Sequence, residues 1–103
     1  MRIVYNITFH VNKGIEKEWV ATIWRTYIPF ARSVTSSPPL FTRIKSAEEP
    51  DPSFSLQLFF DREEAYRYFV EKKLEASLSL LSRRFPGDFL YFCTTLEEVS
   101  HED

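Results

Sequence analysis

Polar side chains of one parity lie along residues 3–11, a segment in which apolar and polar residues alternate. Asn6, Thr8 and His10 share the polar face of this segment, and Gln57 on a second alternating segment could join them. The unperturbed pKa of an imidazole lies near neutrality, so a histidine such as His10 could serve as a general acid or base beside a small polar ligand. The amides and hydroxyl could instead satisfy one another, or a twofold-related copy, because buried amides need partners. The pattern favours this structural interpretation, with Asn6, Thr8 and Gln57 at a dimer interface.

A second group of candidates consists of aromatic residues at helical spacing shortly before a proline. Trp19, Trp24 and Tyr27 precede Pro29, whose ring disrupts the helix that contains it. Concave apolar spaces are the usual ligand sites, so these three residues could frame a cavity between helix and sheet for a small hydrophobic or aromatic molecule. Together with His10 they are the ligand-binding candidates. Aromatic residues at this spacing more often belong to the core, and the pattern alone favours that alternative.

Cys93 is the remaining residue with chemical potential. A catalytic cysteine needs a base or a cationic environment, and residues 89–94 supply neither, so a buried or half-buried thiol in a strand is expected. Two histidines and one cysteine cannot form a Cys/His zinc site, and His10 and His101 have no metal-ligand spacing. With only two glycines, the chain has no glycine-rich phosphate loop. We expect no metal and no cofactor.

The charge balance also limits the partners. The 103 residues carry 13 Lys and Arg against 15 Asp and Glu, a net charge of -2, which is the wrong sign for binding to a phosphate backbone. An RNA-recognition module would need glycine and basic residues in the third strand, and residues 53–60 have none. No apolar run is long enough to cross a membrane. Nucleic-acid and membrane partners are therefore not expected, and the lone cysteine suggests the reducing cytoplasm.

Alternation and helical spacing predict the elements that must position these residues. The first helix runs from residue 15 to a kink at Pro29, followed by a short helical turn over residues 30–34. The second starts at a capping box, Asp61-x-x-Glu64, and carries an apolar stripe as far as Phe85. The expected strands cover residues 3–11, 40–46, 53–60 and 89–96.

The resulting order, βαββαβ, predicts an α+β ferredoxin-like fold. In this arrangement both helices cover one face of a four-stranded antiparallel sheet and leave the other face bare. The chain has 10 Phe, 5 Tyr and 2 Trp, more aromatic side chains than one helix–sheet layer absorbs, so some are expected at an interface or pocket. We therefore expect a homodimer formed sheet to sheet. Residues 1–99 are interpreted as one domain and residues 100–103 as an acidic tail.

Short motifs along nearly the whole chain resemble one protein family. They are Tyr5-Asn6-x-Thr8-x-x-Val11, Glu18-Trp19 followed by Trp24, Ile28-Pro29, Gln57 among aromatic residues, and Phe92-x-Thr94-x-Leu96-Glu97. This set resembles an uncharacterised bacterial domain-of-unknown-function family of the dimeric α/β-barrel superfamily. The resemblance implies the ferredoxin-like fold and the homodimer. The family pattern has a His where this chain has Tyr27 and an Arg where it has Cys93, so an activity that depends on those two residues is not expected here.

The superfamily contains enzymes and binding modules, and a shared fold does not transfer a reaction. We interpret the chain as a homodimeric α/β-barrel domain of unknown function that binds a small molecule or another protein. The alternative is a cofactor-independent oxygenase or isomerase with a pocket between sheet and helices. For that role the sequence offers only His10, Tyr27, Cys93 and carboxylates.

Overall fold

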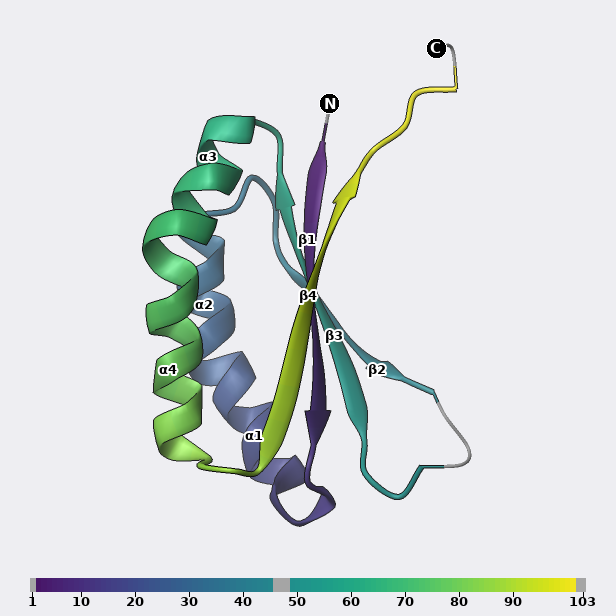
Figure 1. Ribbon diagram of the computed structural model, residues 1–103, viewed down its shortest axis with the longest axis vertical. Coiled ribbons are helices and arrows are strands. Elements are labelled where there is room, and N and C mark those ends of the chain that lie inside the picture. Colours follow the sequence, from purple (N-terminus) through teal and green to yellow (C-terminus); the bar gives the residue numbers. More distant parts are fainter. Residues whose placement is uncertain (1, 46–48, 102–103) are drawn as a thin grey trace.

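A computed structural model describes residues 2–45 and 49–101. Within these ranges, four strands form one antiparallel sheet in the order β2-β3-β1-β4, and two helical stretches cover one of its faces (Figure 1). The elements along the chain are β1 (Ile3–Val11), η1 (Lys13–Ile15), α1 (Glu16–Thr22), η2 (Ile23–Tyr27), α2 (Ile28–Arg32), β2 (Leu40–Ile44), β3 (Ser53–Phe60), α3 (Glu63–Tyr68), η3 (Phe69–Lys73), α4 (Leu74–Arg84) and β4 (Phe89–Glu97). The predicted ferredoxin-like βαββαβ fold is confirmed.

The two central strands begin and end where their alternation predicted. β1 and β3 pair along their length, from Ile3 opposite Phe60 to His10 opposite Ser53. Side chains of successive strand residues point to opposite faces, so one face of this pair is apolar and the other polar. β4 ends one residue later than expected, at Glu97, and β2 ends at Ile44, two residues short of the predicted end, which lies outside the described residues.

The first helical stretch continues through Pro29. Its middle, η2, is a π-helix in which the N–H of Ile28 bonds to the carbonyl of Ile23, five residues earlier. Pro29 directly follows this widened turn and lies inside a helical stretch that continues on both sides of it. The predicted interruption is thus a π-helical turn, and the helix after it ends at Arg32, two residues before the expected limit.

The capping box expected at the start of the second helix is not formed. The helix begins at Glu63, its N-cap is Arg62, and Arg62 makes no side-chain capping bond. The N–H of Asp61 instead binds the hydroxyl of Ser36 at 2.8 Å, which holds Asp61 in the loop before the helix. Because Arg62 is extended, with φ −129° and ψ 138°, the carboxylate of Asp61 cannot serve as the cap.

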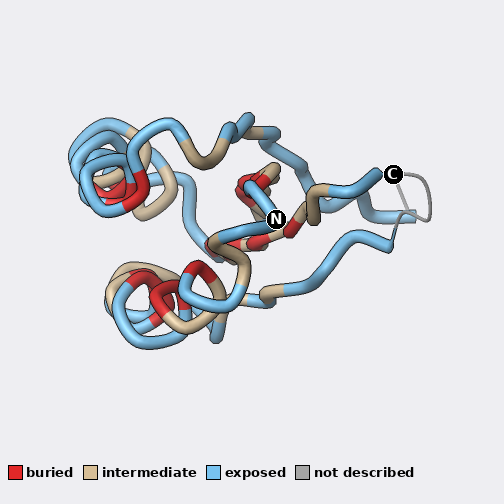
Figure 2. The backbone as a smooth tube through the Cα atoms, turned by 90° about the horizontal axis from the view of Figure 1, so that it is seen from below, coloured by how far each residue is buried: buried red, intermediate tan, exposed pale blue. Residues whose placement is uncertain are grey.

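The core lies between the helices and the apolar face of the sheet. Figure 2 shows the two helical stretches side by side on one side of the sheet, with buried positions where sheet and helices face one another. The largest fully buried side chains include Trp19, Phe9, Phe60, Phe69 and Ile23. None of the helices in the described part of the chain has the length and apolar character needed to span a membrane.

Candidate functional site

The side of the sheet away from the helices, which we call the open face, carries a polar strip along β1 and β3. Asn6 lies opposite Gln57, and Thr8 lies opposite Ser55. The Asn6 amide donates to Thr8 Oγ1 at 3.0 Å, and the Ser55 hydroxyl donates to Asn6 Oδ1 at 2.5 Å. The side chain of Gln57 bonds to none of the described residues. The strip therefore satisfies most of its own polar groups and leaves the Gln57 amide available to another molecule.

His10 stands at the end of this strip. Its Nδ1 lies 2.8 Å from the hydroxyl of Ser53 and 3.7 Å from a carboxylate oxygen of Glu49. The imidazole is 42% exposed and the Glu49 side chain 56% exposed. A contact with a carboxylate that is this accessible to water contributes little to stability. His10 thus belongs to the open face, on the opposite side of the sheet from the three aromatic candidates.

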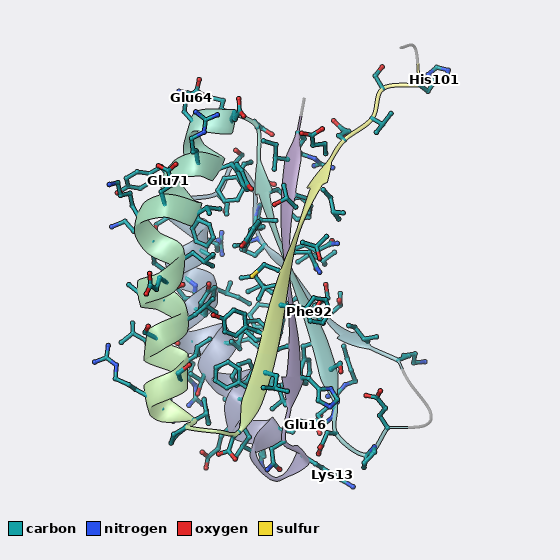
Figure 3. The ribbon with its side chains drawn as sticks, viewed as in Figure 1. Lys13, Glu16, Glu64, Glu71, Phe92 and His101 are labelled. Carbon is teal, nitrogen blue, oxygen red and sulfur yellow. The ribbon has the colours of Figure 1, made fainter. Side chains whose placement is uncertain are left out.

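Apolar side chains flank the polar strip on both edge strands. Residues of β4 that pair with the polar positions of β1 point to the open face, and Phe92, opposite Thr8, is 62% exposed (Figure 3). The other exposed apolar residues of the open face are Leu90 and Leu96 on β4 and Leu40 and Ile44 on β2. The open face thus has a polar centre with apolar margins, which is unusual for a surface that remains in water.

The two helical stretches enclose a groove, which we call the interhelix groove. Its first part is a hollow of about 300 Å³, lined by Tyr27, Phe30, Lys73, Ala76 and Ser77, together with residues that also line a second hollow described below. Both π-helical turns end at this hollow, η2 with Tyr27 and η3 with Lys73. π-Helical turns inside α-helices occur frequently at functional sites.

A buried pair of hydroxyl groups forms the polar wall of this first part. Tyr27 Oη lies 2.9 Å from Ser77 Oγ, and the Ser77 hydroxyl donates to the Leu74 carbonyl at 2.7 Å. Because the single proton of Ser77 is used in that bond, Tyr27 is the donor in the pair. Burial raises the pKa of Tyr27 to about 12, although the bond to Ser77 opposes the shift. Tyr27 is therefore a neutral phenol near neutral pH and cannot act as a base.

The second part of the groove is a hollow of about 360 Å³ further along the same helices. It shares Thr26, Leu80 and Leu81 with the first part, so the two are continuous. Its other lining residues are Thr22, Arg25 and Arg84. Arg84 Nε donates to Thr22 Oγ1 at 3.1 Å, a bond that ties the two helices together.

The structure separates the aromatic candidates from one another. Trp19 is fully buried in the core, with its ring centroid 5.0 Å from that of Phe9 and 4.7 Å from that of Phe89. Trp24 is 55% exposed and packs against Phe41, with 6.1 Å between the two ring centroids. Of the three, only Tyr27 lines the interhelix groove.

Cys93 is half-buried on the helix side of β4, beside Tyr5. Burial and the neighbouring thiol raise the pKa of Tyr5 well above its usual range. The described residues contain no group of three or more His, Cys, Asp or Glu side chains placed to hold a metal ion.

Sequence reasoning missed several residues of these two regions. Ser53 and Ser55 alternate with the apolar residues of β3 in the same way as Gln57, so their parity would have identified them as partners of His10 and Asn6. Ser77 and Lys73 carry no comparable signal, because only the packing of the helices brings them to Tyr27.

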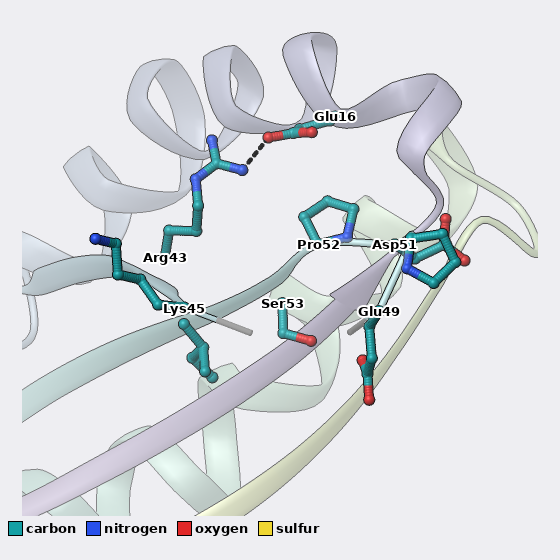
Figure 4. A pocket seen from close by; sticks show the side chains of 9 residues that line it. Glu16, Arg43, Lys45, Glu49, Asp51, Pro52 and Ser53 are labelled. Carbon is teal, nitrogen blue, oxygen red and sulfur yellow. Dashed lines mark hydrogen bonds and ion pairs between the residues drawn. The ribbon is translucent and has the colours of Figure 1, made fainter. Parts of the chain in front are cut away.

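A third hollow, of about 590 Å³, lies where β2 ends and β3 begins (Figure 4). Its lining carries charges of both signs, and Arg43 forms an ion pair with Glu16 across it. Residues 46–48, which follow Lys45, lie outside the described part of the chain.

Solved structures with this fold are known at low sequence identity. An ethyl tert-butyl ether d (EthD) family protein from Bacillus halodurans has a TM-score of 0.66 and 18% identity, covering 94% of this chain and 99% of its own. SnoaB, a cofactor-independent oxygenase from Streptomyces nogalater, has a TM-score of 0.62 and 16% identity, covering 96% and 94%. A dimeric ferredoxin-like protein from an uncultured marine organism has a TM-score of 0.68 and 9% identity, covering 97% of each chain. The structural neighbours are thus dimeric α/β-barrel and ferredoxin-like proteins, and identities this low show the fold alone.

No curated protein matches the chain in sequence. A family model does match, over residues 2–99, which is nearly the whole chain. This agrees with the resemblance noted from the motifs. The chain therefore belongs to the family described as domain of unknown function DUF4286.

Proposed function

We propose that the protein is a homodimer that binds a small, largely apolar molecule in the interhelix groove. The observation that carries this proposal is the first part of the groove, in which apolar side chains surround one buried hydroxyl pair, Tyr27 and Ser77. Ligand sites are typically concave and mostly apolar, with a few fixed polar groups and volumes of roughly 300–1,000 Å³. The groove has this character, and the two π-helical turns that end there support the same interpretation.

The open face supports the homodimer. Apolar residues that are more than 40% exposed flank the polar strip on the face of the sheet that the helices do not cover. A second copy, related by a twofold axis, would cover the apolar margins and offer a partner to Gln57, because a twofold interface brings the same patch of both copies together. Two of the similar structures are described as dimeric ferredoxin-like proteins.

We place the protein in the cytoplasm. Its single cysteine cannot form a disulfide within the chain, and Cys93 lies half-buried on the helix side of the sheet. A reducing compartment is the simplest environment for such a thiol.

The alternative, a cofactor-independent oxygenase or isomerase, has the likeness in fold to SnoaB as its support. An enzyme of this kind needs a group that exchanges a proton near neutral pH within reach of its substrate. The titrating phenol in the groove, Tyr27, has its pKa raised to about 12. This favours binding over proton transfer, and turnover of a groove ligand by the purified protein would favour the enzyme instead.

Two matched variants test the proposal. Leu80 in the groove and Phe92 on the open face are both 62% exposed, so replacing either with serine removes apolar surface without opening the core. We expect Leu80→Ser to weaken the binding of 1-octanol at least about tenfold and to leave the dimer intact, because full burial of a leucine side chain contributes about 1.5–3 kcal/mol. We expect Phe92→Ser to weaken the dimer at least about tenfold and to leave octanol binding unchanged, because aromatic residues dominate interface energies.

Native mass spectrometry and sedimentation velocity measure the dimer, and amide chemical shifts in NMR spectra locate and quantify octanol binding. A wild-type protein that stays monomeric at micromolar concentration would overturn the homodimer. If octanol changes the chemical shift of no amide near the groove, the proposed ligand site is wrong.

A further inference from the structure

We infer that the natural ligand of the interhelix groove is an amphipathic organic acid, whose carboxylate binds between Arg25 and Arg84 while its apolar body lies over Leu80 and Leu81 toward Tyr27. The inference rests on the proposed function and adds the chemical class of the ligand. It depends on the charges of the groove, which the proposed function does not use.

All the charged side chains among the described residues that line the groove are cationic. Lys73 lies in the first part and Arg25 and Arg84 in the second, with no Asp or Glu among the lining residues of either part. The whole chain carries a net charge of -2, so this concentration of positive charge runs against its overall balance. A local positive field in an otherwise acidic protein selects for an anionic ligand.

The two arginines differ from Lys73 in what they offer. Arg25 forms no ion pair or hydrogen bond with any residue in the described ranges. Arg84 donates through Nε to Thr22, which holds the guanidinium in place and leaves its terminal N–H groups for another acceptor. Guanidinium groups match the planar geometry of a carboxylate and bind it through paired hydrogen bonds. The ammonium of Lys73 lies 5.7 Å from the ring centroid of Tyr68, and the guanidinium of Arg84 lies 5.4 Å from that of Phe85, so the geometry of the guanidinium and not the aromatic contact distinguishes the arginines.

The middle of the groove fixes the character of the rest of the ligand. Leu80 and Leu81 line both parts, and Phe30 and Ala76 continue the apolar wall toward Tyr27. Lys73 and Arg84 are separated by about 16 Å along the helix axis, at a rise of about 1.5 Å per residue. A groove of this length suits a medium-length chain or a ring system rather than a small anion alone.

Three probes of the purified wild-type protein test the inference. Octanoate has both the apolar chain and the carboxylate, 1-octanol has the chain alone, and acetate has the carboxylate alone. We expect octanoate, below its micellar concentration, to bind at least about tenfold more tightly than octanol, since one charge-assisted bond corresponds to about that factor. We expect acetate to bind far more weakly than either. Amide chemical shifts over residues 22–30 and 73–84 measure all three affinities and report where each probe binds.

Charge-removing variants identify the carboxylate site. We expect Arg25→Gln to reduce octanoate affinity about tenfold and octanol affinity much less, because octanol carries no charge. Arg84→Gln should act in the same way, but it also loses the bond to Thr22, so Arg25→Gln is the decisive variant. Arg83→Gln is the matched control, because Arg83 is an exposed arginine next to Arg84 in α4 and does not line the groove.

The outcomes separate the inference from the proposed function. Equal affinities for octanoate and octanol in the groove would overturn the anionic ligand and leave the ligand site standing. Acetate binding as tightly as octanoate would overturn the amphipathic ligand, because the apolar body would then contribute nothing. If neither octanoate nor octanol binds in the groove, the inference and the ligand site both fall.

Discussion

Tyr27 is a buried phenol that bonds to Ser77 and also lines the proposed ligand site. Its hydroxyl donates to Ser77, while the oxygen lone pairs remain able to accept a bond from a molecule in the groove. The ring packs edge to face against Phe30 at a centroid distance of 5.8 Å, which fixes the orientation of the hydroxyl. A ligand group that donates a hydrogen bond would find this oxygen already positioned.

Burial of Tyr27 predicts a loss of stability in alkali. The pKa is 10.0 for an ordinary tyrosine and about 12 in the folded protein, so between these values the unfolded chain releases a proton that the folded chain retains. The contribution of Tyr27 is therefore complete below pH 10 and is lost as pH rises toward 12, by about 2–3 kcal/mol. We expect Tyr27→Phe to reduce this alkaline loss by about that amount, measured by urea unfolding between pH 8 and 11.5. Identical pH profiles for the wild type and Tyr27→Phe would contradict the assignment.

Trp19 and Trp24 show which residue-level information the sequence lacks. Both fit a helical spacing, yet Trp19 is fully buried with no hydrogen-bond partner for Nε1 among the described residues, whereas Trp24 is 55% exposed. A π-helical turn begins between them, at Ile23, and adds a residue to the turn that contains Trp24. At about 100° per residue, an ordinary helical period already places Trp24 about 140° around the helix from Trp19, and the sequence alone does not show which of these two faces packs on the sheet.

Among the elements, the strands were the most predictable from sequence and the helix termini the least. The alternation in β1 and β3 places apolar residues on the one face that the helices cover, so a shift by one residue would expose the whole core. The start of α3 depends instead on a contact between Asp61 and Ser36, residues that are distant in sequence. Neither this contact nor the π-helical turns produce a local pattern. The interhelix groove, which depends on those turns, was therefore not predictable as a site.

The π-helical turn before Pro29 predicts that this proline is tolerated at little cost. The wide turn that ends at Ile28 replaces the regular bonding to the fourth preceding residue just before Pro29, so the loss of the proline N–H adds little cost. We expect Pro29→Ala to change the free energy of unfolding by less than about 1 kcal/mol. Ser79→Pro is the contrasting variant, because Ser79 lies within α4, and we expect it to cost about 3 kcal/mol or more. Urea denaturation measures both, and a large destabilisation by Pro29→Ala would show that the proline itself supports the bend.

The dimensions of the whole molecule agree with a missing partner. The chain measures 45 × 30 × 18 Å with a radius of gyration of 14.3 Å, against about 13 Å for a typical domain of this length. Its exposed surface is 6992 Å², whereas a monomer of 12.2 kDa usually exposes about 6,000 Å². The excess is comparable to the roughly 800 Å² that each partner buries in a standard interface.

A dimer of this kind predicts that thermal stability depends on protein concentration. Association that involves only the folded state stabilises it by mass action, so the Tm should rise with concentration. We expect the Tm of the wild type to increase by several degrees between about 1 and 100 μM, and the Tm of Phe92→Ser to rise less over the same range. Differential scanning calorimetry provides the measurement. A Tm of the wild type that does not vary with concentration would contradict a dimer in this range.

The strand order β2-β3-β1-β4 has a consequence for how the protein aggregates in solution. β4 is an edge strand of nine residues whose outer backbone N–H and C=O groups have no partner within the sheet, and its sequence around Tyr91 and Phe92 is rich in residues that favour strands. Side-by-side pairing of such edge strands from different molecules would join the molecules into a continuous sheet. A second copy seated on the open face would shield the side chains of β4 and hinder this route, so dimerisation and fibril growth would compete for the same strand.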